Sequence, residues 1–382
     1  MGATHYDAII VGGGVIGCAI AYYMTQEGAK VLLLEQERIA AGASSAAAGM
    51  LGAQAELIES RPLLELALRS RSLFPSVAEQ LKAWSGIDIG LQRKGLLRVA
   101  RTAQEAAMLK AAAAEQQQLG EQADWLTPAE ARHLEPHLSP DMQGALHIEE
   151  DGQVSAPDLT RAFAASAAAL GADIAEHAEV QQLLVERGRV QGVRLRDRTI
   201  YANKLVLAAS IGAVELLRSI GYELPMFPVK GECVLVQTTR PLLAKTIYTH
   251  GCYLVPKKGG ELLIGATVTP HSYDRKVTAG GVQHLIKQAS QLVPAVQDAE
   301  WKRAWAGLRP QTPHGLPYMG EHPQVKGLLL AAGHYRNGIL LSPITGMIMT
   351  ELAAGKRATV DLSAFSVEDG VRECAAELVK GG

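Results

Sequence analysis

The sequence predicts an α/β protein in which a doubly wound, Rossmann-like domain carries an inserted domain built on an antiparallel β sheet. Three observations lead to this class. Residues 6–35 have the pattern of a strand, a glycine turn, a helix and a second strand; residues 226–268 are rich in β-branched residues and Gly/Pro turns; and residues 328–355 repeat the strand–glycine–helix order. Two nucleotide-type units therefore flank one β-rich region.

The chain is long enough for two domains. It has 382 residues, of which 48% are hydrophobic and 20% are charged, as is usual for a soluble globular protein. We expect a discontinuous nucleotide-binding domain over residues 1–88, 146–220 and 300–382. The substrate domain is expected to span residues 89–145 and 221–299.

The first unit contains a phosphate-binding turn. The apolar run Ala8–Val11 predicts a buried parallel strand, and the motif Gly12-x-Gly14-x-x-Gly17 leads from it into a helix. These glycines permit a tight turn, a close approach of backbone N–H groups to a pyrophosphate, and close packing of the helix on the strand. The second strand ends in Glu35, whose carboxylate suits an adenosine ribose and would repel the 2′-phosphate of NADP. Both FAD and NAD are compatible with this unit.

A segment of small residues, Ala40–Ala53, follows the second strand. Small side chains let a chain run close to a bound ring system, so we expect a loop and a helix start that cover the cofactor. Ser44, Ser45, Gly49 and Met50 would then contact it. The alternative is a flexible connector.

The middle of the chain alternates helical and strand patterns. Helical spacing predicts helices over residues 56–81, 102–120 and 157–170, and short apolar runs predict strands over 181–186, 189–195 and 204–209. Val180, directly before the first of these strands, is expected to touch the cofactor. The run at 204–209 ends in small residues, which predicts a second approach of the sheet to the cofactor and favours FAD.

The β-rich region and the returning unit complete the prediction. The sequence KKGGE at 257–261 predicts a hairpin turn within an antiparallel sheet. After a strand over residues 328–332, a turn opens a helix near Gly338, whose N-terminus offers positive potential to a reduced flavin without a titrating side chain. This feature favours a flavin over a nicotinamide. The turn and helix residues expected to bind the cofactor are Gly333, His334, Arg336, Asn337, Gly338 and Ile339.

Three polar side chains are candidates for holding a substrate. Arg309 stands among apolar neighbours, where a guanidinium is costly unless it pairs with an anion, and its planar fork suits a carboxylate. Arg336, beside the expected flavin loop, is a similar candidate, and Tyr253 could donate its hydroxyl to the same carboxylate. The alternatives are structural salt bridges for the two arginines and a buried core position for Tyr253.

Composition excludes several other functions. The formal net charge of -2, with no dense Lys/Arg run, argues against nucleic-acid and membrane partners and favours a small-molecule substrate. Four separated cysteines (Cys18, Cys233, Cys252 and Cys374) form no CxxC pair, so we expect neither a disulfide framework nor a metal site. His133 and His137 have an i,i+4 spacing, but Pro136 interrupts it, which favours a surface loop. With no signal peptide or long apolar run, we expect a cytoplasmic protein.

Six separated motifs resemble those of the bacterial glycine oxidases, a group within the D-amino acid oxidase family of FAD-dependent amine oxidases. They are AIIVGGGVIGCAIAYYM from residue 8, SSAAAGMLGA from 44, PVKGE from 228, CYLVP from 252, WAGLRPQTPHGLPYMG from 305 and AGHYRNGILLSP from 332. The resemblance covers nearly the whole chain and implies a homotetramer with non-covalent FAD. It also implies that Arg309 holds the substrate carboxylate, Tyr253 assists it, Arg336 is a second arginine at the site and Met50 lines a small pocket beside the flavin.

The resemblance further implies the reaction. Glycine, sarcosine and small D-amino acids would lose a hydride from Cα to flavin N5 with no side chain acting as acid or base, giving an imine or glyoxylate, ammonia and, with oxygen, hydrogen peroxide. A role in making the thiazole of thiamine is implied as well. The alternatives are a D-amino acid dehydrogenase that uses another electron acceptor, and a flavin-binding protein without turnover.

Overall fold

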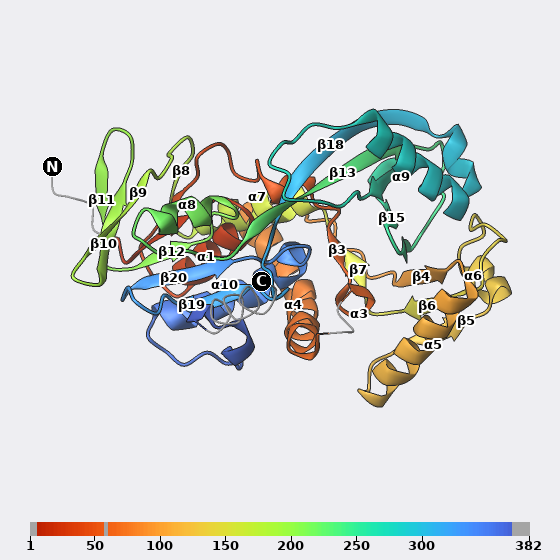
Figure 1. Ribbon diagram of the computed structural model, residues 1–382, viewed down its shortest axis with the longest axis horizontal. Coiled ribbons are helices and arrows are strands. Elements are labelled where there is room, and N and C mark those ends of the chain that lie inside the picture. The colour runs from red at the N-terminus through yellow and green to blue at the C-terminus, as the bar shows by residue number, and fades with distance from the viewer. Residues whose placement is uncertain (1–5, 57–59, 369–382) are drawn as a thin grey trace, which may run out of the picture.

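The chain folds around two sheets that lie side by side (Figure 1). The computed structural model describes residues 6–56 and 60–368. One sheet is parallel except at one edge, and the other is largely antiparallel, which confirms the predicted fold class. Cys374 lies outside the described residues.

The parallel sheet gathers strands from both ends of the chain. In spatial order it contains β19 (Tyr318–Glu321), β20 (Leu328–Ala332), β12 (Leu205–Leu207), β1 (Ala8–Val11), β2 (Val31–Leu34) and β8 (Asp173–Ala175). Only β19 runs antiparallel to its neighbour. Nearly all residues of the four inner strands are buried, as expected for a parallel sheet that is covered on both faces. The predicted first, second and returning strands are therefore confirmed.

Helices cover one face of this sheet and a smaller layer covers the other. The first layer consists of α1 (Val15–Gln26), α4 (Arg61–Ser85), α7 (Ala156–Ala169) and α10 (Gly338–Ala353). The second consists of α8 (Gly212–Arg218) and a three-stranded sheet of β9 (Gln182–Glu186), β10 (Arg189–Arg194) and β11 (Thr199–Tyr201). Helices α1 and α10 pack closely, because a Cβ added at Gly346 would lie 2.4 Å from the ring of Tyr23.

The second sheet has nine strands and forms the other half of the molecule. Its strands are β4 (Leu96–Ala100), β5 (Asp124–Leu126), β6 (Gly144–Ile148), β13 (Phe227–Gln237), β14 (Thr246–Thr249), β15 (Cys252–Pro256), β16 (Glu261–Gly265), β17 (Thr269–Pro270) and β18 (Glu300–Gln311). Helices α5 (Ala103–Gln118), α6 (Pro128–Leu134) and α9 (Ala279–Leu292) pack against it. The KKGGE turn joins β15 to β16 as an antiparallel pair, as predicted.

Several local expectations need correction. The long strand β18 pairs with β13 in the nine-stranded sheet, although residues from 300 onward were expected in the cofactor domain; the other domain boundaries stay predictions. The helix expected over 56–81 is α4, which begins at Arg61 and ends at Ser85, and the short helix α3 (Ala53–Glu56) precedes it. His133 lies in the last turn of α6 rather than in a loop, and His137 lies beyond the helix end.

A short connection lies between the two sheets (Figure 1). It contains α2 (Ala43–Ala46) and a two-stranded ribbon of β3 (Met50–Leu51) and β7 (Gly152–Gln153). The buried carboxylate of Asp151 forms an ion pair with Nη1 of Arg71 at 2.7 Å. It also accepts a hydrogen bond from the backbone N–H of Ala55 in the first turn of α3. Within residues 6–56 and 60–368, no helix combines the length and apolar character needed to cross a bilayer.

Candidate active site

A cavity of about 670 Å³ lies at the carboxyl ends of β1, β12 and β20, where the N-termini of α1 and α10 approach each other. This is the usual ligand position in an open α/β sheet, and the two helix N-termini favour anionic groups. The residues expected to bind the cofactor that line it are Gly12, Gly14, Glu35, Ser44, Val180, Gly333, His334, Arg336, Gly338 and Ile339.

The glycine turn leaves no room for side chains. Gly12 has a φ of 114°, and a Cβ there would lie 2.5 Å from the carbonyl oxygen of Ala208, directly after the neighbouring strand β12. A Cβ at Gly17 would lie 1.9 Å from the carbonyl oxygen of Gly12, so only glycine allows this close contact between helix and turn. Gly17 does not itself line the cavity. Backbone, rather than side chains, therefore forms this wall of the cavity.

Polar side chains close the end of the cavity that carries the glycine turn. The carboxylate of Glu35 accepts the backbone N–H of Gly13 at 2.7 Å and that of Glu37 at 2.8 Å. The Ser44 hydroxyl accepts the N–H of Val15 at 2.9 Å, at the N-terminus of α1. Ser45 is different: its hydroxyl donates to the carbonyl oxygen of Gly42, and it lines a neighbouring cavity.

The other end of the cavity is formed by the turn before α10. Gly333 has a φ of 78°, and a Cβ there would lie 2.3 Å from Cγ2 of Thr312. The ring of His334 faces α10, where its Nε2 lies 3.2 Å from the hydroxyl of Thr345. Burial lowers the pKa of His334 to about 3, so its imidazole stays neutral at physiological pH. This turn therefore offers backbone N–H groups and a helix end rather than an acid or base.

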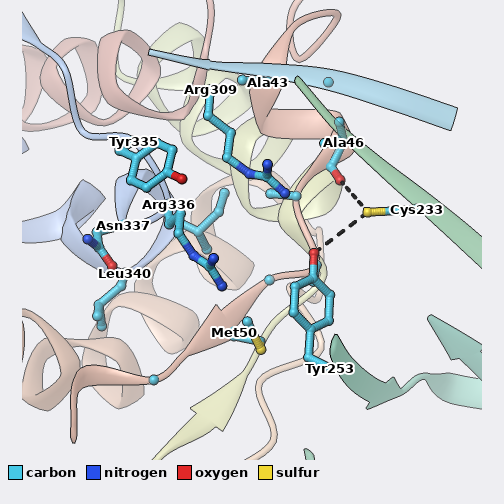
Figure 2. Close-up of a pocket in the computed structure, with 17 residues that line it drawn as sticks. Ala43, Ala46, Met50, Cys233, Tyr253, Arg309, Tyr335, Arg336, Asn337 and Leu340 are labelled. Atoms are coloured by element: carbon cyan, nitrogen blue, oxygen red, sulfur yellow. Dashed lines mark hydrogen bonds between the residues drawn. The ribbon is translucent and has the colours of Figure 1, made fainter. Parts of the chain in front are cut away.

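A smaller cavity of about 80 Å³ shares lining residues with the large one (Figure 2). All four residues expected at the substrate line it: Arg309, Tyr253, Arg336 and Met50. Gly49 and Asn337, which were expected at the cofactor, line it as well. Figure 2 shows both guanidinium groups and the Tyr253 hydroxyl directed into the same space.

Arg309 projects from β18 across the neighbouring strand β13. A Cβ at Gly231 of β13 would lie 2.2 Å from both Nη1 and Nη2 of Arg309, so only glycine lets the guanidinium lie flat there. Nη1 donates to the carbonyl oxygen of Thr267 at 3.3 Å. Among the residues that the structure describes, no carboxylate forms an ion pair with Arg309. Its remaining N–H groups can thus serve a bound anion.

Tyr253 reaches the same cavity from β15. Its hydroxyl lies 3.6 Å from the Cys233 sulfur, and a Cβ at Gly265 on the paired strand β16 would lie 2.4 Å from that hydroxyl. Burial is the main reason that the pKa of Tyr253 is raised well above its usual value, with the nearby Cys233 adding to the effect. The phenol therefore remains protonated and is a hydrogen-bond donor.

Two further side chains at the site were not expected from the sequence. The Tyr248 hydroxyl accepts a hydrogen bond from Nη2 of Arg336 at 3.3 Å, and Tyr248 stands opposite Tyr253 in the β14–β15 register. Cys233, on β13, lines the small cavity beside Arg309. A glycine inside a predicted strand, such as Gly231 in PVKGE, was the available signal that something packs closely there.

Comparison with known proteins identifies the family. Residues 7–352 match the family described as DAO, FAD dependent oxidoreductase. The chain belongs to this family. Glycine oxidase of Geobacillus kaustophilus is 47% identical to this DAO family member over 98% of the chain and 100% of the relative. The crystal structure of glycine oxidase from the same organism superposes with a TM-score of 0.93 at 48% identity, covering 95% of this chain and 99% of that one.

Another relative is larger. The bifunctional protein ThiO/ThiG of Trichormus variabilis is 35% identical to this chain. The aligned region covers 94% of this chain and 54% of that relative. As a DAO family member the chain is an FAD-dependent oxidoreductase, and the large cavity fits that cofactor. The glycine turn at α1 and Glu35 suit the pyrophosphate and ribose, and the Gly333–Gly338 turn suits the flavin end.

Proposed function

We propose that this protein is a glycine oxidase that also accepts sarcosine and small D-amino acids. The products are the imine or its hydrolysis product glyoxylate, together with ammonia and hydrogen peroxide. The observation that carries the proposal is the convergence of the Arg309 guanidinium and the Tyr253 hydroxyl on a small cavity beside the cofactor cavity. The identity to glycine oxidases over nearly the whole chain supports the choice of substrate.

Binding of the carboxylate is the first task of the site. A guanidinium presents paired N–H donors to a carboxylate, and each hydrogen bond to a charged group contributes about 1.5–3 kcal/mol. The Tyr253 phenol, kept protonated by burial, adds a third donor. With its carboxylate held by Arg309 and Tyr253, a small amino acid can turn its Cα toward the cofactor cavity, since Arg336 and Ile339 line both cavities.

The chemistry needs little from the side chains beyond orientation. When bound, FAD accepts the hydride that leaves the substrate Cα and later passes the electrons to oxygen. The residues at the small cavity then hold the substrate in one orientation, and its buried walls exclude water from the reacting carbon. The α10 N-terminus at Gly338 offers positive potential at the cofactor end of the site. The volume of about 80 Å³ favours substrates with few non-hydrogen atoms.

Adding glycine to the purified yellow protein under anaerobic conditions tests this function. The flavin absorption band should bleach within the time of one turnover, and readmitted air should restore it with one equivalent of hydrogen peroxide. Bleaching without peroxide in air would favour a D-amino acid dehydrogenase that uses another electron acceptor. A band that glycine, sarcosine and D-alanine all leave unchanged would refute amine oxidation.

We further propose that the oxidation supplies the glycine-derived imine for making the thiazole of thiamine. The bifunctional ThiO/ThiG relative supports this, because a region like this chain is joined there to a second protein. Deleting the gene in its own organism should create a growth requirement that added thiazole alcohol relieves. Normal growth of the deletion strain without thiamine would contradict this role.

A further inference from the structure

Lys257 lies behind one wall of the small cavity, directly after β15. Its Nζ donates to the carbonyl oxygen of Ala48 at 2.6 Å, to the side-chain oxygen of Gln153 at 2.7 Å and to the carbonyl oxygen of Val154 at 3.1 Å. An ammonium group has three donors, and all three are used. Among the described residues, no carboxylate forms an ion pair with this ammonium.

The ammonium of Lys257 is partly buried and lines a separate cavity of about 250 Å³, where a cation without a paired carboxylate is costly. Burial lowers the pKa of Lys257 to about 7, because the charged form loses its contact with water. The neighbouring Lys258 shows the ordinary arrangement, since it is exposed and pairs with Asp88 at 3.1 Å. Three convergent hydrogen bonds to neutral acceptors therefore indicate that Lys257 fixes the positions of the groups it touches.

Those groups belong to the wall that carries Met50. Ala48, Gly49 and Met50 line the small cavity one after another. Gly49 has a φ of 82°, and a Cβ there would lie 2.0 Å from the carbonyl oxygen of Val154, one of the acceptors of Lys257. The wall is thus packed directly against the chain that the ammonium holds.

An adjoining part of the cavity wall belongs to β15, the strand directly before Lys257. Side chains alternate along β15: Cys252 and Leu254 pack in the core beneath α9, whereas Tyr253 and Val255 pack in a separate cluster with Ala48. Lys257 continues the alternation of Tyr253 and Val255, and its contact with Ala48 places it on their side of the strand. The strand β15 therefore places the Tyr253 hydroxyl at the cavity, and Lys257 directly after it holds the segment that bears Met50.

We propose that Lys257 is a positioning residue that holds the Met50 wall against the adjoining Tyr253 wall, and so restricts the site to the smallest amino acids. This inference rests on the proposed amine oxidation. It concerns the choice among substrates, since Lys257 does not line the small cavity itself. Without the ammonium, the Ala48–Met50 segment keeps only its apolar packing against β15, and the cavity can widen.

The test compares Lys257→Met with Lys258→Met, a matched change at the exposed neighbour. For each protein, the ratio of kcat/KM for N-ethylglycine to kcat/KM for glycine is measured, because this ratio is independent of the fraction of folded enzyme. We expect the ratio to rise about tenfold in Lys257→Met and to stay within about twofold of the unchanged protein in Lys258→Met. FAD content and the thermal midpoint report on folding.

A binding measurement separates positioning from chemistry. The dissociation constants of acetate and of the bulkier pivalate are read from their perturbation of the flavin spectrum. In Lys257→Met, pivalate should gain affinity relative to acetate. If folded, FAD-loaded Lys257→Met keeps both the substrate ratio and the ligand ratio, the proposal is wrong.

Two further outcomes are decisive as well. If Lys257→Met does not fold, the same ratios are measured on Lys257→Gln, which keeps two N–H donors on a shorter side chain; unchanged ratios there overturn the proposal and shifted ones support it. Failure of the unchanged protein to bleach with glycine would instead refute the proposed function. The two failures are therefore distinguishable.

Discussion

The two halves of the molecule use glycine for opposite purposes. In the parallel half, Gly12 and Gly333 remove side chains so that a ligand can approach the backbone. In the antiparallel half, Gly231 and Gly265 remove side chains so that Arg309 and Tyr253 can lie flat over a neighbouring strand. Backbone therefore forms much of the wall of the large cavity, whereas the side chains of Arg309 and Tyr253 line the small one. Substitutions in the two halves should therefore fail in different ways.

The largest expected effect is a loss of FAD binding when the glycine turn before α1 is disrupted. Gly17→Val would place a Cβ 1.9 Å from the Gly12 carbonyl oxygen, so the phosphate-binding turn must open. We expect a purified protein with almost no FAD, measured as the ratio of flavin to protein absorbance. Gly280→Val is the control, because Gly280 stands at the start of α9 with open space around it. Equal FAD content in the two variants would show that the turn tolerates a side chain.

Removing the Arg309 guanidinium should weaken substrate binding and leave FAD bound. Arg309→Leu deletes the paired donors to the carboxylate, and a loss of about 3 kcal/mol corresponds to a fall of roughly 100-fold in kcat/KM for glycine. FAD content should match the unchanged protein. Lys302→Leu, an exposed change on the same strand, serves as the control. Unchanged kinetics in Arg309→Leu would remove this residue from the site.

A smaller effect is expected when the Arg309 guanidinium is displaced by a substitution on the neighbouring strand β13. Gly231→Ala adds a methyl group where the Arg309 guanidinium lies, and the flexible arginine can move aside. We expect KM for glycine to rise about tenfold, with little change in the thermal midpoint, since about 1.4 kcal/mol of binding is lost. Gly280→Ala should leave both quantities unchanged. A normal KM in Gly231→Ala would show that the position of Arg309 does not matter for binding.

The smallest effect concerns acid stability of the cofactor half. His322 accepts the backbone N–H groups of Gln324 and Val325 at its Nδ1, both at 3.1 Å, and burial lowers its pKa to about 4. The unfolded chain binds a proton near pH 6.5 and the folded chain does not, so stability falls as the pH falls through this value. Between pH 7.5 and 5.5 the loss from this group is about 1 kcal/mol.

His322→Asn is the matched variant for that prediction, because the Asn side-chain oxygen can accept the same backbone N–H groups and does not titrate. The free energy of unfolding is measured at pH 7.5 and 5.5 for both proteins. The variant should lose about 1 kcal/mol less between the two pH values than the unchanged protein. An identical loss in both proteins would show that His322 titrates normally in the folded chain.

The sequence alone determined the cofactor half. Local patterns predicted the strands β1, β2, β12 and β20, and the glycine turn and Glu35 follow directly from spacing along one continuous segment. Such features are readable because neighbouring residues form them, and their backbone conformations demand particular residue types. The resemblance to an oxidase family named four substrate-site residues, and all four are among those that line the small cavity.

Only the tertiary structure decided how the substrate half meets the cofactor half. The strand β18 was expected with the cofactor domain, and its pairing with β13 is what lays Arg309 over Gly231. Cys233, Tyr248 and Lys257 reach the site or its wall from strands whose positions depend on long-range pairing. Register between distant strands is fixed by packing across the whole sheet, so no local pattern in the chain reveals which side chains will converge.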